Sequence, residues 1–234
     1  MPRAITLARP RLSRRKEARV VARSVPTVTR IVEGALALFN QADGAAVTTN
    51  HIAAHLGMSP GNLYYHFRNR EEIVRAIFPR IVAGGLAATA APGGRLSAHE
   101  FGERHLQGLH TLWQFRFFFR DLNQLVARDP RLATEYRDYQ QRLGAQYRGI
   151  FEQLIAQGSM RAPERGEDLD RLVASSIVVW VNWLPHVLAL SPGREITRRD
   201  VVDGALQSFL VVAPLLERRF AAETRGVIER DVPS

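Results

Sequence analysis

The sequence predicts an all-α protein, because apolar residues recur three and four positions apart along most of the chain. Proline, glycine and helix-capping residues divide these apolar stripes into separate helices. With 234 residues, 46% of them apolar, the chain is long enough for two helical domains. We expect a basic arm over residues 1–24, a small domain over residues 25–78 and a larger domain over residues 79–234.

Two short helices joined by a tight turn are predicted within residues 48–67. Ile52 and Leu56 give the first helix an apolar face. Gly57 follows them, where a residue in the left-handed conformation can end a helix without a steric penalty. Ser59 and Pro60 then begin the second helix, since a serine hydroxyl caps free amides and proline is tolerated in the first turn.

The second of these helices has an unusual exposed face. Leu63 and Phe67 lie four residues apart and turn inward. The residues left facing solvent are Gly61, Asn62, Tyr64, Tyr65 and His66. Because such groups can contact phosphates and base edges, we interpret residues 48–67 as a helix-turn-helix DNA-binding element. The alternative is a surface helix with stray aromatic residues, but adjacent exposed tyrosines have no structural purpose.

The chain resembles the TetR family of bacterial transcriptional repressors in four stretches that follow one another in the expected order. Residues 28–41 resemble the first helix of that family, with Val28, Ile31, Ala35, Leu38 and Phe39 on one face. Residues 48–50 resemble the start of its second helix, residues 59–67 its recognition helix, and residues 69–72 the start of its fourth helix. The rest of the chain is similar only in length and helical character.

This resemblance implies a DNA-binding role for particular side chains. Residues 60–67 are expected to enter the major groove, with Pro60, Gly61, Asn62 and Tyr64 near base edges and Asn50 reaching a base from the preceding helix. Contacts to the DNA backbone are expected from Thr48, Thr49, Asn69 and Arg70. Tyr65 and His66 are expected to contact the backbone too, although the family uses these two positions for bases as well, and Ser59 completes the expected DNA-binding set. Asn69 has an alternative structural role, because its spacing to Glu72 is that of a capping box.

Nearly all of the net charge of +9 lies in the first 23 residues, where seven arginines and Lys16 face Glu17 alone. Residues 24–78 balance four arginines against four acidic residues. An arginine-rich arm beside a DNA-binding domain can lie along phosphates or enter a neighbouring minor groove. The alternatives are a disordered leader or a start codon placed upstream of the true one.

Composition excludes several classes of protein. The absence of cysteine excludes disulfides, thiol catalysis and zinc fingers, and the sequence lacks a metal-binding set or a phosphate-binding loop. We therefore expect neither an enzyme nor a cofactor. No apolar run reaches the roughly 18 to 20 residues of a membrane span, and the N-terminus lacks the apolar core of a signal peptide. A cytoplasmic protein without a membrane partner is expected.

Longer helices are predicted beyond Phe78. Pro79 should kink or end the fourth helix, and Gly84-Gly85 together with residues 91–94 are expected to form a linker. Four further helices are expected over residues 97–128, 130–157, 167–190 and 198–221. The run from Phe115 to Phe119 would make the first of these apolar on several sides and therefore central.

Aromatic-lined interiors of helical domains bind small organic ligands, which favours an apolar or aromatic effector. The candidate effector-binding residues are His105, Leu109, His110, Trp113, Arg116, Phe117, Arg120, Asn123, Tyr136, Tyr139 and Trp183. Each has a simpler alternative: Phe117 can be a core residue, and Arg116 and Arg120 can extend to solvent or pair with acids. His105 and His110 lie about 140° apart around a helix, so a metal site is not expected.

The last two predicted helices carry more apolar surface than a small domain covers, and the family resemblance implies that they form a four-helix interface in a homodimer. The candidate interface residues are Leu172, Ile177, Trp180, Val181, Leu184, Leu206, Phe209, Leu210 and Leu216. The alternative is that these side chains pack inside the monomer. The sequence thus predicts a dimeric repressor that a small effector releases from a palindromic operator in double-stranded DNA. An activator, or a ligand-binding protein that no longer binds DNA, is the alternative.

Overall fold

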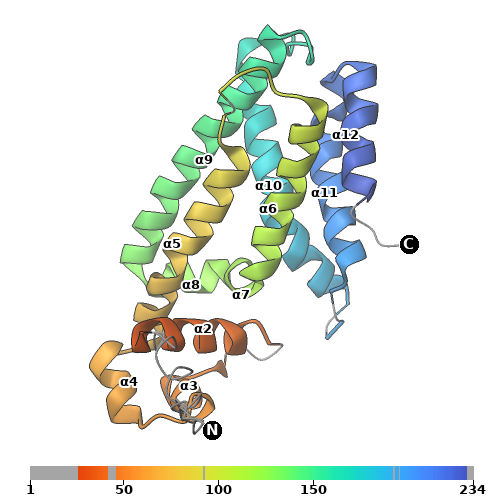
Figure 1. Ribbon diagram of the computed structural model, residues 1–234. Coiled ribbons are helices and arrows are strands. Elements are labelled where there is room, and N and C mark those ends of the chain that lie inside the picture. The colour runs from red at the N-terminus through yellow and green to blue at the C-terminus, as the bar shows by residue number, and fades with distance from the viewer. Residues whose placement is uncertain (1–25, 42–45, 92, 192, 195, 231–234) are drawn as a thin grey trace, which may run out of the picture.

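The protein is all-α, as the sequence predicts. A computed structural model describes residues 26–41, 46–91, 93–191, 193–194 and 196–230, and within these ranges it contains eleven α-helices, a short 3-10 turn and no β-strand. Three short helices form a foot, and the remaining helices form a bundle above it (Figure 1). The predicted basic arm lies outside the described residues.

The foot consists of α2 (Thr27–Phe39), α3 (Thr49–His55) and α4 (Pro60–His66). Its core is formed by Ile31, Phe39, Ile52 and Leu63, all of which are fully buried. Val28, predicted on the same face as Ile31, extends past this core from the first turn of α2 and is 44% exposed. Ile31, Ala35 and Phe39, predicted on that same face, are buried.

One continuous helix, α5 (Arg70–Thr89), rises from the foot into the bundle. Pro79 lies inside this helix and does not end it. Gly84 and Gly85 are also helical, so the prediction that they form a linker is wrong; only residues 91–94 lie between helices. The glycines allow close packing instead, because a Cβ atom on Gly85 would overlap the hydroxyl group of Tyr139.

The helix predicted over residues 97–128 is three helices: α6 (Ala98–Gln114), α7 (Arg116–Arg120) and α8 (Leu122–Arg128). The chain turns at Phe115 and again at Asp121, so α7 and α8 run beneath the bundle and face α2 (Figure 1). This short crossing buries Phe117, Phe118 and Phe119 together. A single straight helix would have pointed these three side chains in different directions.

Two long helices, α9 (Pro130–Ala156) and α10 (Gly166–Leu190), match the predicted bounds. Asp129 caps α9 by accepting hydrogen bonds from the amides of Arg131 and Leu132. Gly158, the residue after the helix predicted over 130–157, has a φ of +77°, which is the left-handed conformation that commonly follows a helix end.

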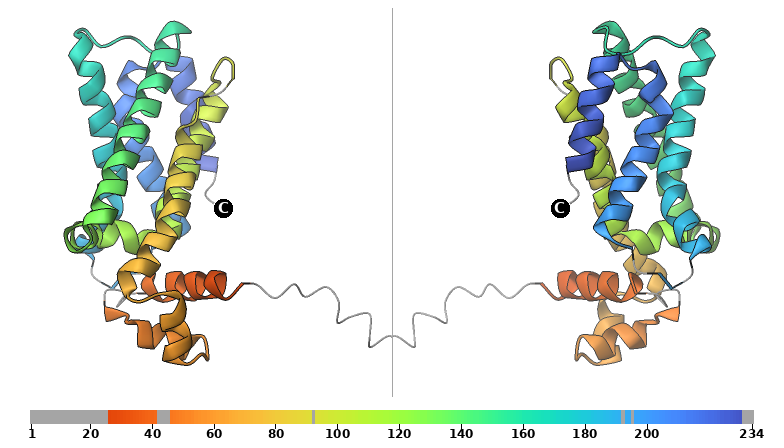
Figure 2. Two further views of the ribbon diagram at one scale, coloured as in Figure 1. Left: turned by 90° about the vertical axis from the view of Figure 1, so that its left-hand side faces the viewer. Right: turned by 90° about the vertical axis from the view of Figure 1, so that its right-hand side faces the viewer.

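The helix predicted over residues 198–221 is also divided. It consists of α11 (Arg198–Val212), a 3-10 turn containing Pro214, and α12 (Arg218–Arg230). Figure 2 shows α11 and α12 together on one side of the bundle. The hydroxyl of Thr224 donates a hydrogen bond of 3.2 Å to the carbonyl of Ala98, so α12 is fastened to the first turn of α6.

Among the described helices, α10 is long and apolar enough to cross a membrane, contrary to the expectation from sequence. Length and composition are weak evidence when a single helix meets this criterion, because core helices of soluble proteins meet it too. In this fold α10 packs against α7, α9 and α11 and buries Trp180, Trp183 and Leu184. We therefore regard α10 as a helix of the bundle.

Candidate nucleic-acid interface and ligand site

The two helices of the predicted DNA-binding element are capped by side chains at their first turns. Thr48 accepts a hydrogen bond of 3.3 Å from the amide of His51, whose Nδ1 accepts one from the amide of Thr48 in return. Ser59 accepts a hydrogen bond of 3.2 Å from the amide of Asn62 at the start of α4. Gly57 has a φ of +62° in the turn between the helices. The cap at Ser59 and the turn at Gly57 are the ones that the sequence predicts.

The outer face of α4 is open to solvent. Tyr64 is 46% exposed and Tyr65 is 85% exposed, while Gly61 and Asn62 are also exposed. The hydroxyl groups of Tyr64 and Thr49 lie 3.1 Å apart and form a hydrogen bond between α4 and α3. This bond holds one exposed tyrosine in a defined position, although nothing in the core requires its hydroxyl.

The remaining candidate DNA contacts have varied surroundings. Asn50 is exposed on α3, and Pro60 is exposed at the first position of α4. His66 is half-buried, with its ring 5.1 Å from that of Tyr65. Asn69 caps α5 through a 2.9 Å hydrogen bond from the amide of Glu72, so the structural role that the spacing suggested is present.

Arg70 is directed toward the bundle. Its guanidinium lies 4.7 Å from the centre of the Phe39 ring, and burial lowers the pKa of Arg70 although Asp121 opposes this effect. A phosphate contact by this side chain would require it to leave Phe39. In this placement the Arg70 side chain contributes to the packing of α5 against α2, and its predicted contact with DNA stays a prediction.

The end of α2 is fastened to the base of the bundle by hydrogen bonds. Asn40 donates through Nδ2 to the carbonyl of Gln114 (2.9 Å) and accepts through Oδ1 from the amide of Phe117 (3.2 Å). Arg120 donates to the carbonyls of Gln41 (3.0 Å) and Phe39 (3.3 Å). We call this contact the interdomain junction; its residues are Phe39, Asn40, Gln41, Gln114, Phe117 and Arg120.

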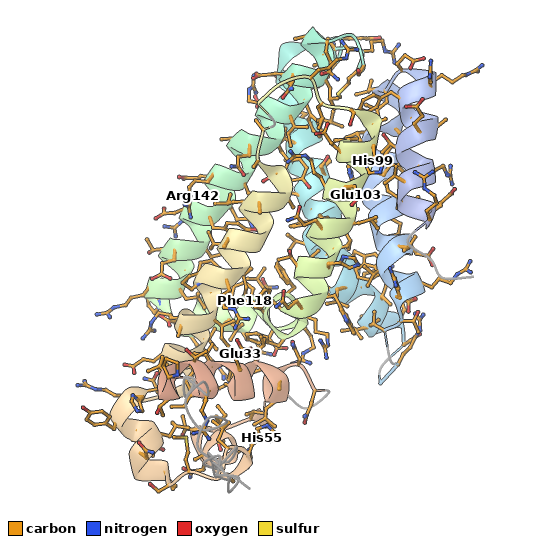
Figure 3. All side chains as sticks on the ribbon, viewed as in Figure 1. Glu33, His55, His99, Glu103, Phe118 and Arg142 are labelled. Atoms are coloured by element: carbon orange, nitrogen blue, oxygen red, sulfur yellow. The ribbon has the colours of Figure 1, made fainter. Side chains whose placement is uncertain are left out.

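A ring contact and an ion pair extend the junction. The rings of Phe39 and Phe117 lie 5.1 Å apart, and Glu33 pairs with Arg80 at 2.8 Å. Figure 3 shows Glu33 on the side of α2 that faces the bundle, below Phe118 at the bundle's base. Sequence reasoning missed Asn40 and Gln41, because no local pattern marks a residue whose partners are more than seventy positions away.

A cavity of about 400 Å³ lies beside the interdomain junction. It is lined by Asn40, Trp113, Arg116, Arg120, Leu188, Gly193, Arg194 and Ile196. Three candidate effector contacts, Trp113, Arg116 and Arg120, therefore come together at one cavity. The guanidinium of Arg116 lies 4.2 Å from the centre of the Trp113 ring.

The other candidate effector contacts are not brought to this cavity. His110 lines a separate groove of about 490 Å³ between α6 and α12, where Figure 3 shows His99 and Glu103. Asn123 is exposed and Tyr136 is half-buried. The remaining candidates are buried side chains of the core: His105, Leu109, Phe117, Tyr139 and Trp183. Two of them pack against other rings of the core: Phe117 lies against Phe118, and His105 lies against Phe101 and Phe209.

Most of the candidate dimer contacts are also core residues. The buried members of that set are Trp180, Val181, Leu184, Phe209 and Leu216. Glycines make room for large side chains here: a Cβ on Gly204 would lie only 2.5 Å from Cε2 of the neighbouring Trp183. Leu172, Ile177 and Leu206 are half-buried. Leu210 is 51% exposed, and Val178, which lies beside Ile177, is 58% exposed.

A capped pair of helices with an exposed polar and aromatic face, set at the foot of a helical bundle, defines a helix-turn-helix transcriptional regulator. Family models match both parts of the chain. The model for bacterial regulatory proteins of the tetR family matches residues 31–77, and the TetR model for a bacterial transcriptional repressor matches residues 86–223. The chain belongs to the TetR family. It is a DNA-binding regulator, and regulators of this family are typically non-enzymatic.

Solved structures support this assignment. A TetR-family transcriptional regulator from Marinobacter aquaeolei VT8 is 29% identical, covers 89% of this chain and 100% of its own, and superposes with a TM-score of 0.78. A tetR-family regulatory protein from Rhodococcus RHA1 is 19% identical over 82% of this chain and 98% of its own, with a TM-score of 0.62. A TetR regulator from Haloarcula marismortui ATCC 43049 is 9% identical over 81% and 98%, with a TM-score of 0.63. The last two show likeness of fold alone. A comparison with curated proteins found no match.

Proposed function

We propose that this protein is a repressor that binds a palindromic operator as a homodimer and is released by a small organic effector. The observation that carries the proposal is the hydrogen bond between Thr49 and Tyr64, which fixes an exposed aromatic side chain on the outer face of α4. A hydroxyl pair with no role in the core is best explained by a partner that the face must meet in a defined geometry. A DNA major groove fits that requirement.

Within this proposal the exposed residues of α3 and α4 have two roles. Asn62, Tyr64, Pro60, Gly61 and Asn50 read bases, whereas Thr48, Thr49, Ser59, Tyr65, His66 and Asn69 contact the backbone. A Cβ on Gly61 would meet nothing within 4 Å, so the protein's own packing leaves this backbone open to DNA. For Arg70, the amide at the start of α5 is the better candidate for a phosphate contact, because its side chain is engaged by Phe39.

The proposed dimer uses the exposed faces of α10 and α11. Val178 and Leu210 are exposed apolar residues on these neighbouring helices, and the half-buried Ile177 and Leu206 lie beside them along the chain. A two-fold axis at this face would present two copies of α4 to one duplex. Successive major grooves then require a separation of roughly 34 to 36 Å between the two reading helices.

In this proposal, residues 25–78 form the DNA-binding domain, and residues 79–234 form the domain for effector binding and dimerisation. Because α5 extends from Arg70 to Thr89, this helix belongs to both parts and can carry movement from one to the other. The family is one of soluble DNA-binding regulators, so we place this protein in the cytoplasm.

An unbiased selection from random duplexes tests the proposal directly. We expect a palindrome to be enriched, and Asn62→Ala and Tyr64→Ala each to lower discrimination by about 1–3 kcal/mol at the affected base pairs. Arg142→Ala, an exposed position on the outer side of α9 (Figure 3), is the control and should retain the preference of the parent protein. Retained discrimination in both α4 variants would refute base reading, and the absence of any enriched sequence would favour a protein that has lost operator binding.

A further inference from the structure

The described lining of the cavity at the interdomain junction carries only positive charge. Its described lining residues include the guanidinium groups of Arg116, Arg120 and Arg194 but no carboxylate. Arg120 and Arg194 pair with Asp121 and Asp200, and neither aspartate lines the cavity. Asp200 is further engaged by the amide and hydroxyl of Thr197. The carboxylates are thus held outside the cavity while the cations face it.

Among the three arginines of the cavity lining, Arg116 is the one for which the described residues supply no carboxylate partner. It stacks on Trp113 and donates one hydrogen bond, 3.2 Å long, to the carbonyl of Trp113. No carboxylate of the described residues pairs with it. Burial lowers the pKa of Arg116, and the nearby charge of Arg120 lowers it further. A partly desolvated guanidinium beside a second one is stabilised by an anion that bridges the two.

Apart from the three arginines and Asn40, the described lining of the cavity is apolar. Trp113, Leu188 and Ile196 supply the apolar lining, and the volume of about 400 Å³ is in the range of small-molecule sites. We propose that this cavity binds a small organic carboxylate, with its anionic group between Arg116 and Arg120 and its apolar body against Trp113, Leu188 and Ile196.

The same cavity gives the carboxylate a route to the DNA-binding helices, and this step rests on the proposed function. Asn40 and Arg120 line the cavity and also form the interdomain junction. An anion that recruits Arg120 competes with the carbonyls of Phe39 and Gln41, which loosens the end of α2. The carboxylate therefore lowers operator affinity, and operator DNA lowers carboxylate affinity by the same factor.

Calorimetric titration of the full chain with 2-naphthoate tests the site without DNA. We expect 2-naphthoate to bind at least about tenfold more tightly than neutral 2-naphthamide or inorganic phosphate. The amide lacks the negative charge that the arginines bind, and phosphate lacks the apolar body that Trp113 and its neighbours bind. Arg116→Gln should weaken naphthoate binding about tenfold or more. Arg137→Gln removes the same charge from an exposed position on α9 and should have no effect. Equal binding of the three probes, or equal effects of the two variants, would overturn the proposal.

A second pair of variants tests the cavity even if Arg116→Gln fails to fold. Leu188→Glu places a carboxylate in the cavity wall and should abolish naphthoate binding, whereas Leu190→Glu, at a 72% exposed position on the same helix, should preserve it. Naphthoate binding that survives Leu188→Glu in a folded protein would place the ligand elsewhere.

Operator affinity measured with and without saturating naphthoate tests the coupling. We expect a decrease with the parent protein and none with Arg116→Gln. Naphthoate binding with unchanged operator affinity would refute the coupling. Failure to find any operator would instead refute the proposed function, and the calorimetric result for the cavity would stand independently.

Discussion

His105 is a histidine that the fold keeps neutral. Its ring lies 4.6 Å from that of Phe101 and 6.1 Å from that of Phe209. The Nδ1 atom is 2.8 Å from the carbonyl oxygen of Phe101, which we interpret as an Nδ1–H donor. Burial lowers the pKa of His105, and this hydrogen bond only partly opposes the effect. The residue proposed from sequence as an effector contact is therefore a core residue.

This environment makes stability depend on pH. As the pH falls below the ordinary histidine value of 6.5, the unfolded chain binds a proton at His105 that the folded protein does not, so the free energy of unfolding decreases. The decrease continues until the pH reaches the lowered pKa of the folded state. We expect urea unfolding to show a loss of up to about 1.4 kcal/mol per pH unit in this window, and a smaller loss in His105→Phe.

Leu106→Ala is the control for that measurement, because it removes a buried apolar side chain without removing an ionisable group. It should lower stability at every pH and leave the pH dependence of the parent protein intact. If His105→Phe and the parent lost stability equally on acidification, the buried histidine would not be the source.

At the scale of elements, α5 and α9 meet at a glycine. The Tyr139 hydroxyl of α9 occupies the space where a Cβ on Gly85 would lie. We expect Gly85→Ala to destabilise the protein by about 1–3 kcal/mol, because the packed aromatic cluster cannot move aside. Adding Tyr139→Phe should recover much of that loss by removing the overlapping oxygen, and thermal unfolding of the single and double variants measures both effects.

Gly149→Ala is a matched control on α9. A Cβ there would meet nothing within 4 Å, so the substitution should stabilise the helix by about 0.5–1 kcal/mol. A Gly85→Ala protein as stable as the parent would show that the two helices can separate at little cost.

Helix boundaries could be predicted where they depend on neighbouring residues. Ser59 is expected from the sequence to begin a helix and caps α4, and Ser97 and Thr197 cap α6 and α11 near the bounds predicted for those helices. The breaks at Phe115 and Asp121 could not be predicted, because they follow from the burial of three phenylalanines beneath the bundle. Gly85 was misread for the same reason: its partner Tyr139 is distant in sequence.

The candidate sites likewise could be predicted where neighbouring residues determine them, and could not where distant residues do. The α4 face could be read from sequence because its inward residues, Leu63 and Phe67, fix which side remains outside. The effector candidates came from residue type alone, so Trp113 was selected together with core residues such as Leu109. For the dimer, helical spacing shows that α10 and α11 are apolar on several sides. It does not show which of these sides is buried inside one subunit and which stays exposed. Trp180 and Val178 illustrate the difference, with exposures of 2% and 58%.

At the scale of the whole molecule, the proposed dimer depends on the apolar side chains of α10 and α11 that remain exposed in one subunit. We expect Val178→Asp together with Leu210→Asp to yield a monomer in sedimentation experiments at micromolar concentration, because interfaces of this kind bury about 2,000 Å² of largely apolar surface. Operator affinity should fall when the dimer is lost, because two linked DNA-binding domains bind a palindrome more tightly than one.

Val28→Asp is the control for the dimer, because Val28 is a 44% exposed apolar residue on α2, away from the proposed interface. It should leave the oligomeric state unchanged. A parent protein that sediments as a monomer would rule out the dimer, and a dimer that survives both charge substitutions would place the interface on another face.

The two hydrogen bonds of Asn40 also decide where this regulator can be recombined with others. The side chain uses both of its amide atoms on backbone groups at the break between α6 and α7, so a foreign segment that ends α2 with another residue would leave the Gln114 carbonyl and the Phe117 amide without these partners. Residues 48–67 form none of these bonds. A hybrid that exchanges residues 48–67 and retains residues 39–41 would acquire new operator specificity while preserving the original response to ligand.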